Sequence, residues 1–370
     1  MSSEWLKVFV KPLKYLKTTG IDTSRNASKK FIAYSVIMNL LFVDLFSFLS
    51  LIPVINDVSN VVDFAHKAGP ASSFIGYNMK VKNFIIKRKK IESLLKLTED
   101  IIESFSWIDV KEGKILKARI AFAEKILKMS MILMLSASCS NPIIILISHN
   151  LPIPYNVEDN QFLFWMSAFY QSFTSLVFTP VLVIMNVLPI IFISFAAGMI
   201  DELCLKLQGI AGHIEKKTDS NEKGLSECIK IHIKIKVYVT EIKDAFGTAL
   251  FIQAFLSTVI LENVLLQDEK AITSLPSVAF MLPMLLEIFL PCYFGNELAL
   301  ASEKISDSLF YSQWQKETKK FKTSMKIIME NSKLSLKIHI FGLFELTLKQ
   351  FIRIVNSVFS LYAVLKNIAT

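Results

Sequence analysis

The feature that most constrains this chain is a series of long apolar runs separated by charged segments. A bilayer core of about 30 Å requires roughly 20 mostly apolar helical residues per crossing, because every backbone polar group must be hydrogen-bonded within the segment. The sequence contains seven candidate runs, at residues 31–52, 61–79, 129–147, 160–200, 245–266, 271–298 and 338–365. It therefore predicts an all-α membrane protein with seven transmembrane helices.

The composition agrees with a chain that lies largely in lipid. Hydrophobic residues make up 52% of it, 29 residues are Phe, and the mean hydropathy is +0.46. These values argue against an ordinary cytosolic enzyme. The net charge of +9 is compatible with nucleic-acid binding in general, but here the charges lie between the apolar runs. We therefore expect membrane lipids, and no nucleic acid, among the partners.

The distribution of Lys and Arg predicts the orientation. Cytoplasmic connections of membrane proteins carry an excess of these residues. Residues 1–30, 80–120, 200–244 and 300–337 hold 34 of the 41 Lys and Arg, whereas residues 53–60, 148–160 and 267–271 hold one. The N-terminus is therefore expected in the cytosol and the C-terminus outside. This topology is the inverse of that of G-protein-coupled receptors.

The charged segments have the pattern of helices rather than of flexible linkers. Within residues 1–30, the apolar residues recur at helical spacing and alternate with Lys; they are Leu6, Phe9, Val10, Leu13 and Leu16. Such a cytosolic amphipathic helix lies either on the inner leaflet or against the protein. Residues 82–119, 201–244 and 303–336 mix aliphatic and charged residues, so we expect the spans to extend into a cytosolic anchor bundle that includes residues 300–337.

The connections on the other side are short and acidic. Their acidic residues are Asp57, Asp63, Glu158, Asp159, Asp268 and Glu269. A cluster of negative charge concentrates cations near a pore mouth. The alternative is that these are ordinary exposed loops.

No pattern typical of catalysis is present. The five His show no metal-ligand spacing, and there is neither a Gly-rich phosphate loop nor a nucleophile elbow. We therefore expect no enzyme, no cofactor and no metal site. Ionisable residues inside apolar runs are either functional or reach the interface from near a span end; they are Asp44, His66, Lys67, Glu262, Glu287, Lys349 and Arg353.

The last run carries a polar stripe. Lys349, Arg353, Asn356 and Ser360 follow one another at intervals of four, three and four residues, so they lie on one helical face. Such a face avoids lipid and must contact either another helix of the same subunit or water. The bulk of Leu361, Val364 and Leu365, close to this stripe, could close an aqueous path by excluding water.

The C-terminal third resembles the insect odorant receptor family. The resemblance rests on the run Cys292-Tyr-Phe-Gly-Asn-Glu297, on Ser302-Glu-Lys-Ile305 with residues 309–314, and on the ending Ser357-Val-Phe-Ser-Leu-Tyr-Ala-Val-Leu-Lys366. These motifs cover residues 290–367; the remaining chain agrees in span number, inverted topology and length. Phe359 stands where many members have Tyr, which removes a hydroxyl group.

The resemblance implies an odorant-binding tuning subunit of a ligand-gated, non-selective cation channel. Such subunits form tetramers with a shared co-receptor in the plasma membrane of olfactory sensory neurons. The family's co-receptor has a long insertion between spans four and five, but here that connection has only about 45 residues. The seventh helix would line the path of the permeating cations, with its gate at Ser360, Leu361, Val364 and Leu365.

The resemblance also implies an odorant site in the outer half of the membrane, among spans two to six. Depth in the expected spans selects Phe64, Ala68, Ser72, Ser136, Cys139, Ser140, Phe169, Phe173, Phe280 and Met281. Each has an alternative role, because small residues permit close helix approach and aromatic residues face lipid. Few charges lie at this depth, so we expect a small, neutral, mostly apolar volatile ligand.

Two alternative functions remain open from the sequence. A gustatory-type receptor would form a homomeric ligand-gated channel and conduct without the co-receptor. A membrane transporter with a midplane site is the second alternative, although the chain lacks inverted repeats and paired Gly- or Pro-broken helices.

Overall fold

The computed structural model of the chain describes residues 2–21, 28–56, 61–104, 113–148, 151, 160–210, 218–267, 275–312 and 314–369. Its helices are α1 (Ser2–Thr18), α2 (Lys29–Asn39), the π-helical η1 (Leu40–Asp44), α3 (Leu45–Asn56), α4 (Val61–Ile86), α5 (Arg88–Ser104), α6 (Lys114–Ser148), α7 (Gln161–Gly209), α8 (Thr218–Gln267), α9 (Leu275–Phe310), the short 3₁₀ helix η2 (Trp314–Lys316), α10 (Lys319–Ser332) and α11 (Leu348–Ala369). The expected acidic residues at 57, 158, 159, 268 and 269 lie outside the described residues.

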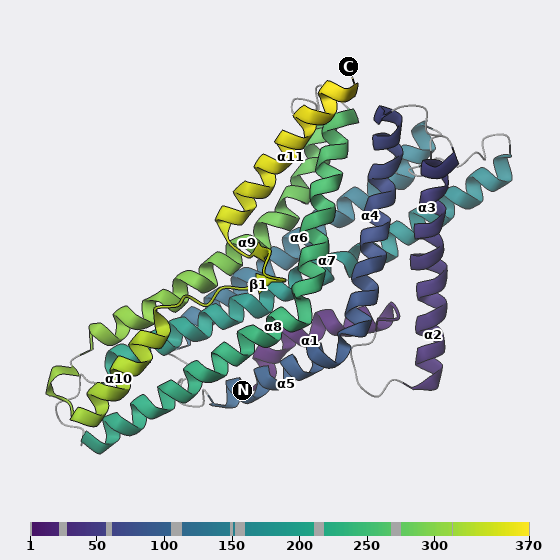
Figure 1. Ribbon diagram of the computed structural model, residues 1–370. Coiled ribbons are helices and arrows are strands. Elements are labelled where there is room, and N and C mark those ends of the chain that lie inside the picture. The colour runs from purple at the N-terminus through teal and green to yellow at the C-terminus, as the bar shows by residue number, and fades with distance from the viewer. Residues whose placement is uncertain are drawn as a thin grey trace.

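The helices form one elongated bundle (Figure 1). α2 continues through η1 into α3 as one rod, and this rod, α4 and α11 run beside the upper parts of α6 to α9. α7, α8 and α9 continue past the others into a long extension, where α10 packs against α8 and α9. The C-terminus lies at the opposite end of the bundle from this extension. The fold is thus all-α, with a helix at each of the seven expected runs.

Four of the described segments are long and apolar enough to cross a membrane by length and composition. They are Lys29–Ile55, Gln161–Gly209, Asn221–Leu266 and Met281–Phe310. The helices at the other three expected spans are α4, α6 and α11.

The seventh helix begins later than the sequence predicts. Residues 338–347, expected within the span, form a small antiparallel hairpin of β1 (His339–Ile340) and β2 (Phe344–Glu345) and the approach to α11. Phe341 and Gly342, between the strands, have φ angles of 53° and 69°, a left-handed conformation that a right-handed helix cannot contain. The helix therefore starts at Leu348 and extends to Ala369, four residues past the expected end of the span.

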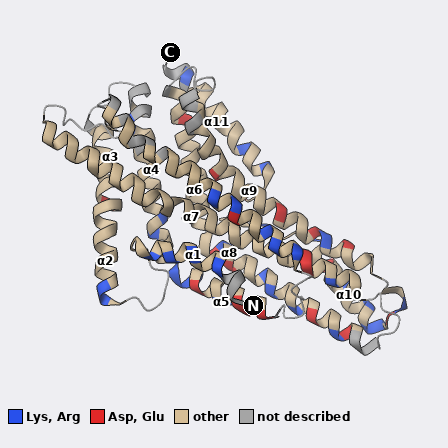
Figure 2. Cartoon of the chain, turned by 180° about the vertical axis from the view of Figure 1, so that it is seen from behind, with Lys and Arg blue, Asp and Glu red and all other residues tan. Residues whose placement is uncertain are grey.

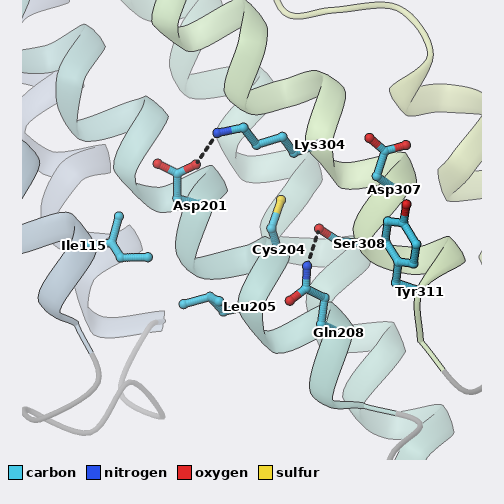
Figure 3. Close-up of a pocket in the computed structure, with 9 residues that line it drawn as sticks. All are labelled: Ile115, Asp201, Cys204, Leu205, Gln208, Lys304, Asp307, Ser308 and Tyr311. Carbon is cyan, nitrogen blue, oxygen red and sulfur yellow. Dashed lines mark hydrogen bonds and ion pairs between the residues drawn. The ribbon is translucent and has the colours of Figure 1, made fainter.

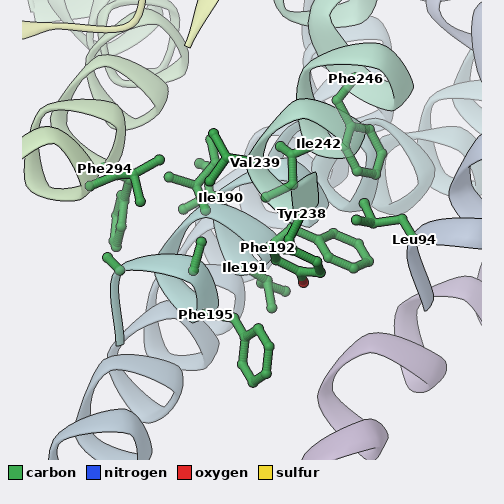
Figure 4. Packing of buried hydrophobic residues seen from close by; sticks show 14 of the residues in the cluster. Leu94, Ile190, Ile191, Phe192, Phe195, Tyr238, Val239, Ile242, Phe246 and Phe294 are labelled. Atoms are coloured by element: carbon green, nitrogen blue, oxygen red, sulfur yellow. The ribbon is translucent and has the colours of Figure 1, made fainter. Parts of the chain in front are cut away.

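The core is built around α7, whose residues 187–200 are buried without interruption. Aromatic rings from α7 and α8 fill its centre (Figure 4). The ring centroids of Phe192 and Phe246 are 5.5 Å apart, and those of Phe195 and Tyr238 are 5.8 Å apart. The Tyr238 hydroxyl lies 3.1 Å from the Thr98 hydroxyl, which joins α5 to the same core. Aromatic pairs of this kind contribute about 0.5–1.5 kcal/mol beyond their buried area.

The N-terminal helix packs on the protein, which is one of the two alternatives that the sequence left open. The Phe9 ring centroid is 4.7 Å from that of Phe192 and 5.6 Å from that of Phe195. Leu13 and Leu16 are buried on the same face, whereas Val10 is exposed. The apolar stripe of α1 therefore covers α7.

Charged side chains gather on α5, on α10 and along the extended parts of α8 and α9 (Figure 2). The upper bundle around α3, α4 and the C-terminal end of α11 is mostly uncharged. Arg119 of α6 pairs with Asp201 of α7 at 2.6 Å, and Lys90 of α5 lies 3.6 Å from Glu241 of α8. The charged side chains are thus concentrated away from the upper bundle.

Gly295 of α9 permits the close approach of the segment that leads into α11. A Cβ atom at this position would lie 3.1 Å from the carbonyl carbon of Leu346 and closer still to its oxygen. Leu346 is fully buried, and its N–H donates to the Ile338 carbonyl at 3.1 Å. The glycine of the sequence motif at 292–297 therefore positions the start of the last helix.

We expect Gly295→Ala to destabilise the purified protein by about 1–3 kcal/mol. The added methyl group would clash with the backbone of Leu346, which its hydrogen bond to Ile338 holds in place. Gly209→Ala is the matched control, since nothing lies within 4 Å of a Cβ atom there. Thermal unfolding in one detergent, followed by circular dichroism, measures both variants. Equal melting temperatures for the two variants would contradict this packing.

Candidate functional site

The α7 aromatics selected by depth lie on the bundle surface. The rings of Phe169 and Phe173 stack with centroids 6.1 Å apart, and Phe173 lies 5.5 Å from the ring of Phe42 in η1. Both α7 rings are exposed, by 70% and 41%. The two rings therefore face outward from the subunit, and Phe173 contacts η1 through Phe42.

The other depth-selected residues are distributed over α4, α6 and α9. Phe64, Ser136 and Cys139 are exposed, whereas Ala68 is buried and its carbonyl accepts a hydrogen bond from the Ser72 hydroxyl at 2.7 Å. The side chains of Ser140 and Phe280 lie outside the described ones. Met281 of α9 is half-buried in a small apolar cluster that includes Val358 of α11.

A cluster of polar side chains from four helices lies at the middle of the bundle; Lys80, Gln253 and Ser257 are buried, and Asn186 and Glu287 are half-buried. Lys80 of α4 donates from Nζ to Oδ1 of Asn186 of α7 at 3.0 Å. Asn186 Nδ2 donates to Oε1 of Glu287 of α9 at 2.7 Å. Oε2 of Glu287 accepts from the amide of Gln253 and lies 3.4 Å from the hydroxyl of Ser257, both on α8.

Removing these polar groups from water costs free energy of hydration, and the hydrogen bonds within the cluster offset that cost. Lys80 and Gln253 are each 5% exposed, and Ser257 is 1% exposed. A buried charge requires an opposite charge and hydrogen bonds to offset the loss of hydration. Ionisable groups retained inside a membrane region are functional candidates for that reason.

The sequence identified only one member of the cluster. Glu287 stood out as a carboxylate inside an apolar run, whereas Lys80 was assigned to a charged connection. Asn186 and Gln253 are single polar residues in apolar surroundings. A lone polar residue in an apolar run is a sign of a functional or packed polar site, but helical periodicity does not show that Asn186 and Gln253 face Glu287.

Asn186 and Glu287 separate two small cavities. The larger, about 40 Å³, lies between α6, α7 and α9 and is mostly apolar; its lining is Ser130, Leu133, Met134, Val183, Asn186, Val187, Ile190, Pro283, Leu286, Glu287 and Leu290. The smaller, about 10 Å³, lies beside Lys80 and Gln253. We call the larger cavity the chamber. It is an apolar space with a polar edge, a lining typical of small-molecule sites, but its volume is well below the roughly 300–1,000 Å³ of such sites.

The polar stripe of α11 faces outward. Lys349, Arg353, Asn356 and Ser360 are exposed, so within this chain the stripe does not pack against another helix of the described part. Next to it, Leu361 is 44% and Val364 55% exposed. The side chain of Leu365 lies outside the described ones.

The opposite face of α11 is packed. Val358 is buried against Leu261 and Leu265 of α8 and Ile288 of α9, and Ile354 and Phe351 extend this contact. The helix is therefore attached to α8 and α9 along one side, and its polar side is available to water or to a second subunit.

A wider cavity than the chamber lies elsewhere, on the extension. This open groove of about 400 Å³ runs between the ends of α7 and α9 beside the start of α6 (Figure 3). Asp201, Lys304 and Asp307 line it; Lys304 Nζ lies 3.9 Å from Asp201, and Gln208 donates to Ser308 at 3.4 Å. Its charged lining does not suit a neutral volatile molecule.

The sequence is similar to those of known odorant receptors. Residues 60–359 match the model of the 7tm odorant receptor family. The chain is 24% identical over 218 residues to odorant receptor 33a of Drosophila melanogaster, covering 56% of each protein. It is 26% identical over 149 residues to odorant receptor Or1 of Anopheles gambiae, covering 39% of this chain and 36% of that one. The chain spans about half the length of the first curated relatives it matches.

Solved structures extend the similarity over the whole fold. The structure of the olfactory receptor OR5 from Machilis hrabei matches with a TM-score of 0.79 at 15% identity, covering 97% of both chains. Its complex with eugenol matches with a TM-score of 0.76 at 12% identity, covering 99% of this chain and 98% of that one. These matches show a shared fold, and the family model covers most of the sequence. The chain is therefore a multi-pass membrane protein that belongs to the insect odorant receptor family, a family of ligand-gated receptors and not of enzymes.

Proposed function

We propose that this chain is the odorant-binding tuning subunit of a non-selective cation channel. It assembles with odorant co-receptor subunits, as a tetramer, in the plasma membrane of olfactory sensory neurons. Its N-terminus and the extension lie in the cytosol, and α11 ends outside. The observation that carries this proposal is the outward polar stripe of α11 beside exposed aliphatic residues.

The stripe supports a path for ions because lipid is a poor environment for it. Lys349, Arg353 and Asn356 project from the subunit. In the proposed topology they lie at membrane depth or close to it, where a charge left in hydrocarbon costs at least about 2.5–3.5 kcal/mol on insertion scales. Water in a shared pore removes that cost. Ser360, Leu361, Val364 and Leu365 would then form the constriction, which the aliphatic side chains close by excluding water.

The chamber supports binding of a small apolar molecule. Asn186 and Glu287 would form its polar floor. The depth-selected residues from Phe64 to Met281 do not line the chamber, and we propose them as a separate, outer contact region for the ligand. A cavity of about 40 Å³ holds little more than one or two water molecules, so an odorant must displace side chains to enter. Ligand binding would thus favour an arrangement different from the one described here, which is the condition for shifting an equilibrium.

Apolar contact sets the expected affinity. Burying about eight to ten CH2-sized groups at about 0.8 kcal/mol each gives roughly 6–8 kcal/mol. Lost translational and rotational freedom offsets several kcal/mol of this gain. We therefore expect micromolar or weaker binding to this subunit.

α9 provides the connection between ligand and gate. Leu286, Glu287 and Leu290 line the chamber, whereas Ile288 of the same helix contacts Val358 of α11. Because packed side chains do not deform continuously, a displacement of α9 at the chamber changes the support of α11. The ligand would open the pore through this shared helix.

Electrophysiology tests the assignment. Cells that contain this chain and an odorant co-receptor should give odorant-dependent cation currents over a broad panel of volatiles, and cells with either chain alone should lack this response. Currents from this chain alone would support the gustatory-type homomeric alternative.

Leu361→Ser should increase the resting current of the assembled channel, because a hydroxyl group in the constriction weakens the exclusion of water. Phe359→Ser is the matched control: it also makes an exposed apolar residue of α11 polar, but it lies about 160° around the helix. Whole-cell recording without ligand measures the leak, normalised to surface expression. Identical currents from wild type and Leu361→Ser would remove Leu361 from the gate.

Met134→Phe should reduce sensitivity to the most effective odorant about tenfold, because the ring fills the chamber and costs binding on the order of 1.4 kcal/mol. Met129→Phe provides the control, since Met129 lies on the same helix, is exposed and does not line the chamber. Dose–response curves give the half-maximal concentrations. If both variants respond alike, the odorant binds elsewhere.

A further inference from the structure

A second groove lies between α2 and the junction of α4 with α5. Figure 1 shows α2 standing apart from the lower part of α4, and α2 has no buried residue. The groove has a volume of about 290 Å³, and its lining is Phe31, Ile32, Ser35, Val36, Asn39, Leu40, Val43, Asp44, Val81, Lys82, Ile85 and Arg88. Its lining shares no residue with that of the chamber.

Polar contacts of Asp44 with Lys82 and Asn78, which we call the polar clasp, close the upper end of this groove. The π-helical turn η1 includes a hydrogen bond from Leu45 N–H to the Leu40 carbonyl. Asp44, at the end of this turn, lies 2.7 Å from Lys82 Nζ and accepts from Asn78 Nδ2 at 2.9 Å. The clasp therefore holds α2 and α4 together above the groove while the helices separate below it.

The end of α1 closes the lower side. The Tyr34 hydroxyl donates to the Thr18 carbonyl at 2.7 Å, and the Ser35 hydroxyl donates to the Gly20 carbonyl at 2.5 Å. Lys17 Nζ lies 5.6 Å from the centroid of the Phe31 ring, which lines the groove. The groove is thus a bounded space between three elements.

The charges of this space favour an anion. Lys82 is paired with Asp44, but Arg88 forms no ion pair within the described residues and is half-buried at the groove. Arg88 is the first residue of α5, where the chain leaves the span, and the Lys-rich α1 lies at the same end of the bundle. A guanidinium group presents several donors in a planar fork that fits a phosphate group.

The exposed apolar residues of α2 and of the first position of η1 define the rest of the ligand. Ile32, Val36 and Leu40 are 48–57% exposed. They recur every four residues, so they follow one helical face, and they line the groove together with Arg88. A molecule that satisfies both parts has an anionic phosphate next to an alkyl chain.

We propose that this groove binds an anionic phospholipid of the inner leaflet. Its phosphate contacts Arg88, and one acyl chain lies along Ile32, Val36 and Leu40. The lipid fills the space between α2 and α4 and couples both helices to the end of α1. In the orientation proposed above, this end of the bundle is at the cytosolic leaflet, which is the leaflet that carries anionic lipids.

Native mass spectrometry of the purified full-length chain tests this site, with phosphatidylserine and phosphatidylcholine of identical acyl chains as probes. Wild type should retain phosphatidylserine more strongly than phosphatidylcholine. Arg88→Gln should weaken phosphatidylserine retention about fivefold, as expected for one basic residue at an anionic interface, and leave phosphatidylcholine unchanged. Lys89→Gln is the control, because Lys89 is exposed, adjacent and outside the groove lining.

Further arms distinguish other occupants. Val36→Trp should reduce retention of both lipids, because the ring fills the apolar part; Arg88→Lys should give an intermediate value and provides a charge-preserving variant if Arg88→Gln fails to fold. Inorganic phosphate should not displace the lipid from wild type. Equal retention by Arg88→Gln and Lys89→Gln, no preference between the two lipids, or full displacement by phosphate would overturn the proposal. So would a Val36→Trp variant that retains lipid but loses assembly with the co-receptor, since the groove would then hold a partner helix.

Discussion

The Glu287 carboxylate, half-buried among four helices, is the constraint around which the centre of this protein is arranged. A carboxylate in a low-dielectric region requires several donors and a nearby cation. Asn186 and the α8 residues supply the donors, and Lys80 supplies the cation through Asn186. Because these partners come from α4, α7 and α8, one acidic residue on α9 fixes the relation of four helices. Apolar packing alone, as among the aromatic rings of α7 and α8, would be less specific about their register.

This cluster also determines where a ligand site can form. Asn186 and Glu287 occupy the boundary between the chamber and the smaller cavity, so the chamber has a polar edge in otherwise apolar surroundings. α9 contributes both to this edge and to the support of α11. Gly295, two helical turns after Glu287 on α9, lets the hairpin and the start of α11 lie directly against α9. The binding region, the transmitting helix and the expected pore helix are therefore connected through one element.

Much of this architecture could be predicted, because hydrophobic length and charge distribution are local properties. All seven helical regions were expected, as were the amphipathic N-terminal helix and the charged helical extension. The start of α11 was predicted wrongly, since the apolar character of residues 338–347 is compatible with a span and only the left-handed turn at Phe341 and Gly342 excludes it. The depth-selected residues stay predictions: depth along a helix is readable from sequence, but the direction that each side chain faces is not. Lys80 was missed for the same reason.

The sequence by itself determined that the chain crosses a membrane, which end bears the charged extension, and which helix carries a polar stripe. Those features depend only on residue type and spacing, because apolar side chains partition into lipid and charged side chains into water wherever they stand in the sequence. The tertiary structure decided which polar residues meet, where α1 packs, that the stripe of α11 faces away from its own subunit, and that α2 leaves a groove beside α4. These depend on contacts between residues that are tens to hundreds of positions apart, such as Lys80 and Glu287. No local pattern encodes such a pairing, because it exists only once the helices have packed.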